Sequence, residues 1–352
     1  MKIAIVGGGV MGCAAALALA KRGAEVVVLE RSVPGAEASS AAAGILGAQI
    51  EMHEKRTMLE TFVRARGAYA AWADELRDAT GIDIGYRVTG ALHTARTEKE
   101  HDEIAHAVAW QRAAGLTAEL LDARAAHDVE PELAEDIVAA AHYPEESQVD
   151  PPALLRALVS AASRARVTLK SGATVERVLV EGDRCVGVRL DERHGGELRA
   201  DAVVLAAGSW SSLVPGIPSA MPRVRPARGQ IVLLDERPPR LRTIVLGGPT
   251  YAVPRGDGRV LCGSTLEFVG FRREVTAGGV HAILSGALRV VPRLAEAEVS
   301  ATWSNFRPHT EGEEMLVGRS ALAGLFLATG HFRNGILLAK VTADAVADAV
   351  LG

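Results

Sequence analysis

The chain has 352 residues, of which 48% are hydrophobic and 4% aromatic, and this predicts two ordinary globular domains with an aliphatic core. A formal net charge of −4 argues against nucleic acid as a main partner, since a surface that binds phosphates has to be basic. Three widely separated cysteines, no leading signal peptide and no membrane-length apolar run lead us to expect a cytoplasmic protein without metal sites, disulfides or membrane contact.

The beginning of the chain predicts a strand, a glycine-rich turn, a helix and a second strand. Lys2–Val6 is a short apolar run suited to a buried parallel strand, and Glu25–Leu29 is another. Between them, Cys13–Lys21 is rich in Ala and Leu and predicts a helix, which Gly23 ends. This order is typical of a βαβ unit that binds a nucleotide.

A G-x-G-x-x-G motif connects the first strand to the helix. Gly7 permits a tight turn, Gly9 lets a pyrophosphate approach the backbone, and Gly12 lets the helix pack close to the strand. The pyrophosphate then meets the positive end of the helix. Glu30, after the second strand, can accept hydrogen bonds from ribose hydroxyls and would repel a 2′-phosphate, which disfavours NADP. We predict a dinucleotide site; the alternative is a glycine-rich turn without a ligand.

The segments beyond this motif favour a flavin over a nicotinamide. Ala38–Leu46 is a stretch of small residues with two hydroxyls, which suits a flat ring and phosphate oxygens, although a surface loop is the alternative. Ala202–Ala206 and Leu325–Thr329 predict strands that return to the same domain. A last helix over residues 335–350, capped by Asn334, would favour negative charge on a reduced flavin. A nicotinamide domain is normally continuous, so this assembly indicates FAD.

The segments between the predicted nucleotide-binding segments have sequence patterns of a second domain. Tyr86–Ala95 and Ile231–Arg259 alternate like strands, with Gly and Pro at turns. Thr97–Ala114 and Glu132–Ala140 look helical. Because no repeat or long linker separates them, the chain must cross between two domains several times, which favours a rigid pair.

Motifs along the whole chain resemble the glycine oxidase branch of the D-amino acid oxidase family of FAD-dependent oxidoreductases. Besides the first glycine motif with Glu30, the matching segments are Ser39–Gly44, Gly208–Ser211, Arg228–Gln230, Tyr251–Arg255 and Gly330–Ala339. The resemblance implies an α/β fold with two domains. A discontinuous Rossmann-like FAD-binding domain comprises residues 1–85, 146–225 and 312–352, and a mixed-sheet α+β substrate domain comprises residues 86–145 and 226–311.

The resemblance also implies which residues contact the cofactor. Some relatives attach the flavin to a cysteine before the loop of Arg307, but Ala301–Thr310 contains none, so we expect noncovalent FAD. The implied FAD contacts are Gly7, Gly9, Val10, Met11, Gly12, Glu30, Arg31, Ser39, Ser40, Ala43, Gly44, Ile45, Val175, Gly208, Trp210, Gly330, His331, Arg333, Asn334, Gly335, Ile336 and Leu337.

Four side chains are implied at the substrate. Arg307 would bind the substrate carboxylate with its planar fork, and Tyr251 would place a hydroxyl beside it. Arg333 would lie near the flavin and the substrate, and Leu266 would line the pocket. Each residue also has an alternative interpretation. Arg307 could be a solvent-facing loop residue and Tyr251 a half-buried residue of a sheet. Arg333 could form an ion pair across the domain interface, and Leu266 could belong to the core. We expect His331 to be a flavin-loop residue whose backbone matters, and not a base.

The implied reaction is oxidative deamination. Hydride passes from Cα of an amino acid with a neutral amine to flavin N5, so that orientation and the flavin's own chemistry supply the catalysis. The imine hydrolyses to a 2-oxo acid and ammonia, and oxygen takes the electrons to give hydrogen peroxide. We expect glycine as substrate, with sarcosine or D-alanine also accepted, and in this family the imine often supplies the thiazole of thiamine.

Other functions remain open from the sequence. One is a dehydrogenase of the same family that acts on D-amino acids or on N-methyl or secondary amino acids and uses an acceptor other than oxygen. A nicotinamide-dependent dehydrogenase and a noncatalytic flavin-binding protein are further alternatives. By resemblance we expect a homotetramer, and the polar stretch Glu51–Arg56 is a candidate for the pocket entrance.

Overall fold

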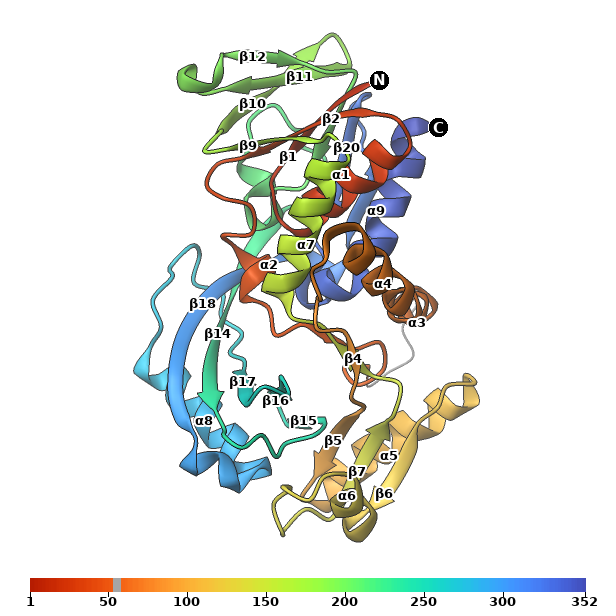
Figure 1. Cartoon of the computed structure of the whole chain (residues 1–352), viewed down its shortest axis with the longest axis vertical. Coiled ribbons are helices and arrows are strands. Elements are labelled where there is room, and N and C mark those ends of the chain that lie inside the picture. Colours follow the sequence, from red (N-terminus) through yellow and green to blue (C-terminus); the bar gives the residue numbers. More distant parts are fainter. Residues whose placement is uncertain (53–57) are drawn as a thin grey trace.

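The computed structural model describes residues 1–52 and 58–352, and one half of it is built on a mainly parallel sheet. Among the described residues this sheet has six strands in the order β19-β20-β13-β1-β2-β9, and only β19 runs antiparallel to its neighbour. The strands are β1 (Lys2–Val6), β2 (Glu25–Glu30), β9 (Thr168–Ser171), β13 (Ala202–Leu205), β19 (Leu316–Arg319) and β20 (Leu325–Thr329). The start, middle and end of the chain therefore meet in one sheet (Figure 1).

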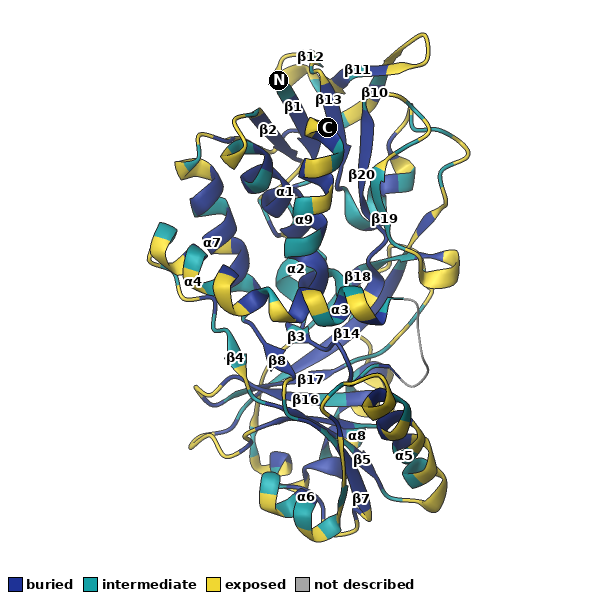
Figure 2. Ribbon diagram, turned by 90° about the vertical axis from the view of Figure 1, so that its right-hand side faces the viewer, coloured by how far each residue is buried: buried dark blue, intermediate teal, exposed yellow. Residues whose placement is uncertain are grey.

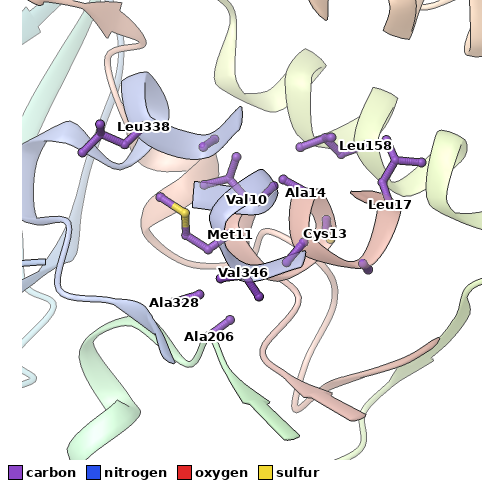
Figure 3. Packing of buried hydrophobic residues seen from close by; sticks show 14 of the residues in the cluster. Val10, Met11, Cys13, Ala14, Leu17, Leu158, Ala206, Ala328, Leu338 and Val346 are labelled. Carbon is purple, nitrogen blue, oxygen red and sulfur yellow. The ribbon is translucent and has the colours of Figure 1, made fainter. Parts of the chain in front are cut away.

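Helices cover one face of this sheet. The layer consists of α1 (Val10–Lys21), α7 (Pro151–Arg164) and α9 (Gly335–Leu351). Outside it, α3 (Leu59–Gly67) packs against α9, and α4 (Tyr69–Thr80) packs against α7. Figure 3 shows Met11 and Cys13 of α1 among Leu158 of α7 and Leu338 and Val346 of α9. Because α1 consists mainly of small buried residues, its neighbours pack close to it, as the Ala-rich sequence predicts.

A small antiparallel sheet covers the opposite face. Its strands are β10 (Val175–Glu181), β11 (Arg184–Leu190) and β12 (Glu197–Arg199). Val178, Cys185 and Val188 of this sheet are buried in one cluster with Val203 and Leu205 of β13. The parallel sheet is thus buried on both faces, which explains its nearly continuous apolar strands.

The second half is built on a mixed sheet. Among the described residues it has eight strands in the order β18-β14-β17-β16-β15-β5-β7-β6. The strands are β5 (Ala91–Ala95), β6 (Glu119–Asp122), β7 (Ala139–Tyr143), β14 (Val224–Asp235), β15 (Ile244–Gly247), β16 (Thr250–Pro254), β17 (Arg259–Gly263) and β18 (Glu298–Thr310). Long β14 and β18 lie side by side and curve towards the first half (Figure 1).

Helices pack on this sheet and short strands join the halves. The helices are α5 (Glu98–Ala113), α6 (Ala123–Val129) and α8 (Ala277–Val290). The joining elements are α2 (Ala38–Ala41), β3 (Ile45–Leu46), β4 (Arg87–Val88) and β8 (Ser147–Gln148). Figure 2 shows both sheets as mainly buried, while exposed residues concentrate on the outer faces of helices such as α4 and α5. In the described part of the chain, no helix combines the length and apolar character that a membrane span needs.

Two local expectations from the sequence are wrong. Glu132–Ala140 is not a helix: its turns end in β7, whose pairing with β5 and β6 overrides the helical propensity. A helix lies earlier instead, at α6, where the side chain of Asp122 accepts the amide hydrogen of Ala125. Asn334 does occupy the N-cap of α9, but its side chain makes no capping hydrogen bond. The predicted domain boundaries remain a prediction.

Candidate active site

Backbone geometry shapes the turn between β1 and α1. Gly7 has φ +109°, and a Cβ on it would lie 2.4 Å from the carbonyl oxygen of Ala206. A Cβ on Gly12 would lie 1.9 Å from the carbonyl oxygen of Gly7, so the first turn of α1 lies directly against the strand end. Gly9 faces an open space beside Ser39. These contacts are the ones that the G-x-G-x-x-G spacing requires.

Glu30 is fixed at the end of β2. Its Oε2 accepts the amide hydrogen of Gly8 at 2.8 Å, and its Oε1 accepts that of Ser32 at 2.9 Å. The Ser39 hydroxyl accepts the amide hydrogen of Val10 at 2.9 Å. The carboxylate and the hydroxyl therefore have defined positions at the start of α1, where the helix end favours bound anions.

A cavity of about 550 Å³ connects this turn to the second half of the molecule. Its volume is in the range of cofactor and ligand sites. Of the predicted cofactor residues, its lining includes Gly7, Gly9, Val10, Met11, Glu30, Arg31, Ser39, Ala43, Gly44, Ile45, Val175, Gly208, Trp210, His331, Arg333, Asn334, Gly335 and Ile336. Tyr251 and Arg307 line the same cavity. The cavity therefore has room for a dinucleotide beside glycines that lack side chains, and it continues to a polar end. Both features fit FAD.

The structure does not place five other predicted residues on the cavity wall. Gly12 packs against the β1 turn, and Leu337 is buried in the core. Ser40 and Gly330 lie next to lining residues without contributing to the wall. Leu266 is 43% exposed in the segment between β17 and α8 and is not among the residues that line the cavity, so its place in the pocket remains a prediction.

Arg307 and Tyr251 approach one another across four adjacent strands. Arg307 lies on β18 and Tyr251 on β16, with β14 and β17 between them. The Arg307 guanidinium donates to the hydroxyl of Ser264 at 2.5 Å and to the carbonyl of Thr265 at 3.1 Å. These bonds fix the fork and direct it towards the cavity.

Two glycines allow the side chains of Arg307 and Tyr251 to come close to one another. The sequence alone does not indicate this role. A Cβ on Gly229 would lie 2.3 Å from Nη1 of Arg307, and a Cβ on Gly263 would lie 2.5 Å from the hydroxyl oxygen of Tyr251. Both side chains therefore lie directly over bare backbone of the intervening strands. The Arg228–Gln230 motif contains Gly229, but only the strand register shows its purpose.

Electrostatics at this end depend on burial and on neighbouring charges. Burial lowers the pKa of Arg307, nearby Arg333 lowers it further, and Tyr251 and Glu51 oppose the change. Burial raises the pKa of Tyr251, against the effect of Arg307. At neutral pH the tyrosine is thus a neutral hydroxyl beside a guanidinium, which is a suitable pair for binding a carboxylate.

His331 is buried where β20 leads into α9. Burial lowers its pKa from 6.5 to about 3, and its Nε2 lies 2.9 Å from the hydroxyl of Thr342. The ring is therefore neutral throughout the physiological range and occupied by a hydrogen bond. With so low a pKa the imidazole is a weak base, which makes it poorly suited to proton abstraction.

Side chains from the second half hold the small-residue stretch in place. Arg255, which follows β16, donates to the carbonyls of Ala43 and Val149, and Trp303 donates to the carbonyl of Ala41 at 3.0 Å. The end of α2 and the residues after it are therefore held by side chains of the second half of the molecule. Arg255 belongs to the Tyr251–Arg255 motif, but nothing in the local sequence indicates this contact.

The aromatic ring of Trp210 makes a cation–π contact with an arginine. The guanidinium of Arg31 lies 4.0 Å from the ring centroid, and Glu37 pairs with both Arg31 and Arg273. Because Arg273 comes from the segment before α8, this group also joins the two halves. Arg31 and Trp210 line the cavity together.

The polar stretch predicted at the pocket entrance is only partly described. His53–Arg56 lies outside the described residues. Of the remaining two, Glu51 lines the cavity and Met52 is buried.

The fold and the site together are those of a flavin-dependent oxidoreductase. A family model described as FAD dependent oxidoreductase matches residues 2–349, so the chain belongs to this family. The predictions of an FAD enzyme and of a D-amino acid oxidase-like fold are confirmed.

Individual relatives are similar over the whole chain. Glycine oxidase of Geobacillus kaustophilus is 38% identical across 99% of this chain and 92% of its own length. The crystal structure of that enzyme has a TM-score of 0.93, covering 99% of this chain and 94% of its own. The crystal structure of glycine oxidase from Bacillus cereus has a TM-score of 0.92 at 31% identity, covering 100% and 95%. These similarities confirm the predicted resemblance to glycine oxidases.

A second kind of relative is longer. The bifunctional protein ThiO/ThiG of Nostoc sp. is 38% identical across 99% of this chain, but the chain spans only 52% of that protein. The match therefore concerns about half of the bifunctional relative.

Proposed function

We propose that this protein oxidises glycine, and with it sarcosine or D-alanine, to the imine. The observation that carries the proposal is the single cavity that joins the Gly7–Gly9 turn to Arg307 and Tyr251. Such a cavity brings a dinucleotide cofactor and a carboxylate-binding pair together, which is what an amino acid oxidase needs. The names of the similar glycine oxidases support the same substrate.

Each residue has a distinct part in this proposal. Arg307 and Tyr251 bind the substrate carboxylate and orient Cα, while Arg333 adds positive charge beside them. FAD, bound along the predicted contact residues that line the cavity, supplies the hydride acceptor. No protein base is needed at Cα, and the neutral, hydrogen-bonded His331 suits this requirement. The imine then hydrolyses to a 2-oxo acid and ammonia.

The flavin is held without a covalent bond in this proposal. Among the described residues that form the cavity wall there is no cysteine. Cys13, Cys185 and Cys262 are buried elsewhere, and burial raises the pKa of Cys262 to about 12, so its thiol is unreactive. We propose oxygen as the acceptor, with hydrogen peroxide as the second product. The ThiO/ThiG relative supports a place for the imine in thiamine formation.

The experiment is anaerobic mixing of the purified holoprotein with glycine, sarcosine, D-alanine and D-proline. Glycine should bleach the visible flavin absorbance, and admission of air should restore it with release of peroxide. Bleaching without peroxide would favour a dehydrogenase that uses another acceptor. A flavin that none of the four compounds reduces would overturn the proposal.

A further inference from the structure

The substrate's amine has no assigned partner, although its carboxylate has two. This question rests on the proposed function, because it concerns the amino acid that the cavity is proposed to bind. An amino acid at neutral pH is a zwitterion, so a site that binds only its carboxylate leaves an adjacent positive charge without a partner. The cavity that Arg307 and Tyr251 line is also lined by Glu51.

Other acidic side chains on the cavity wall are occupied or remote. Both oxygens of Glu30 accept backbone amide hydrogens, and Glu37 pairs with two arginines. Glu176 belongs to β10, in the half that contains the glycine turn (Figure 1). Among the described acidic residues of the wall, Glu51 is the one whose charge acts on both Arg307 and Tyr251.

The backbone immediately before Glu51 is firmly held. The buried carboxylate of Glu146 accepts amide hydrogens from Ala48 at 3.1 Å, Gln49 at 2.5 Å and Ile50 at 3.1 Å. Oε1 of Glu146 in turn lies 3.6 Å from Nη1 of Arg66, which is also buried. A buried ion pair thus fixes the three residues that lead to Glu51, so the carboxylate of Glu51 is presented from a defined position.

We propose that Glu51 recognises the substrate amine. Its carboxylate faces the ammonium group of the arriving zwitterion, while Arg307 and Tyr251 face the carboxylate. Before oxidation the ammonium group would give one proton to water, which frees the nitrogen lone pair. Oxidation would then break the Cα–H bond, with its electron pair and hydrogen passing as hydride to the bound flavin. The nitrogen lone pair forms the C=N bond, and the nitrogen becomes positive. A carboxylate beside that nitrogen stabilises the developing charge, in addition to binding the substrate.

This arrangement makes Glu51 a specificity residue. A 2-hydroxy acid offers the same carboxylate to Arg307 and Tyr251 but carries no positive nitrogen for Glu51. The protein should therefore select amino acids over 2-hydroxy acids of equal size. Acetate, which has only the carboxylate, should bind without help from Glu51.

The test compares Glu51→Gln with the wild-type holoenzyme in two measurements. The kcat/KM for glycine should fall at least about tenfold, because the lost contact is a charge-assisted hydrogen bond. The dissociation constant of acetate, followed by perturbation of the flavin spectrum, should stay the same or fall. Acetate has no ammonium group for Glu51 to bind, and the substitution removes a negative charge that acts on Arg307. Glu51→Asp, which keeps the charge, should give an intermediate kcat/KM and the same acetate affinity.

Glu60→Gln is the matched control, since Glu60 is an exposed residue of α3 and the substitution removes the same charge. It should behave as wild type in both measurements. The inference is overturned if Glu51→Gln oxidises glycine like the wild type, or if acetate weakens as much as glycine does. A wild-type protein that oxidises no amino acid would instead refute the proposed function itself.

Discussion

The two ends of the cavity are formed by different kinds of group: the nucleotide end mainly by backbone, and the substrate end mainly by side chains. At the nucleotide end, bare backbone forms the site: Gly7 and Gly12 leave no room for a Cβ, and Glu30 is held by amide hydrogens. At the substrate end, the side chains of Arg307 and Tyr251 form the site over neighbouring strands. A backbone site depends on local sequence, whereas a side-chain site depends on the residues that lie across the sheet.

The largest effect should come from a methyl group at the nucleotide end. Gly12→Ala places a Cβ 1.9 Å from the carbonyl oxygen of Gly7, so the turn must shift. We expect the protein to be isolated without flavin and therefore without oxidase activity, a larger loss than any substitution at the substrate end should cause. Flavin content after gel filtration measures this. Gly278→Ala is the control, since a Cβ there meets nothing within 4 Å, and normal flavin content in Gly12→Ala would contradict the account.

Removing the guanidinium of Arg307 should weaken substrate binding without affecting FAD binding. Arg307→Ala should weaken substrate binding by about 2–5 kcal/mol, the usual cost of losing one partner of a buried charged pair. FAD content should be unchanged, because Arg307 belongs to the other end of the cavity. Steady-state kinetics with glycine and the flavin spectrum give both readouts. Kinetics like those of the wild type would remove the carboxylate assignment.

A smaller effect is expected from Gly229→Ala, which tests whether the substrate end also depends on bare backbone. The added Cβ would lie 2.3 Å from Nη1 of Arg307, so the guanidinium must move. We expect kcat/KM to fall by about 10- to 100-fold, since small misplacement of an orienting group is costly. FAD content should again match that of Gly278→Ala, and a loss of FAD would show that the two ends are not separable.

The smallest effect concerns stability, at His331 between the two ends. Its pKa is lowered from 6.5 to about 3, so below its ordinary pKa the unfolded chain binds a proton that the folded chain does not. Stability should therefore fall as the pH drops from about 6.5 towards 3, by up to about 2 kcal/mol at about pH 5. Urea midpoints near neutral pH and near pH 5 measure this. His331→Asn should lack this part of the loss, and an equal loss in both proteins would refute it.

The sequence predicted much of the nucleotide end because its determinants are local. The glycine spacing, the two flanking strands and Glu30 lie within the first βαβ unit, and the returns over β13 and β20 are short apolar strands. The structure has these strands within one or two residues of the predicted bounds. Periodicity and turn chemistry suffice for such elements.

The substrate end was harder to predict from the sequence because it depends on which residues lie opposite one another in neighbouring strands. Tyr251 pairs directly with Gly263, and Arg307 lies diagonally from Gly229, but this register exists only in the folded sheet. The same limitation explains the helix wrongly predicted over Glu132–Ala140, where strand pairing decides the outcome. Leu266, assigned to the pocket by resemblance, is exposed and is not among the residues that line the cavity.

The central claim is that one cavity holds FAD and an amino acid's carboxylate side by side. A crystal structure of the holoprotein with acetate tests it most directly. We predict acetate on the guanidinium of Arg307 and the hydroxyl of Tyr251, with the flavin ring between them and the β1–α1 turn. Acetate bound elsewhere, or a flavin ring outside this cavity, would contradict the account.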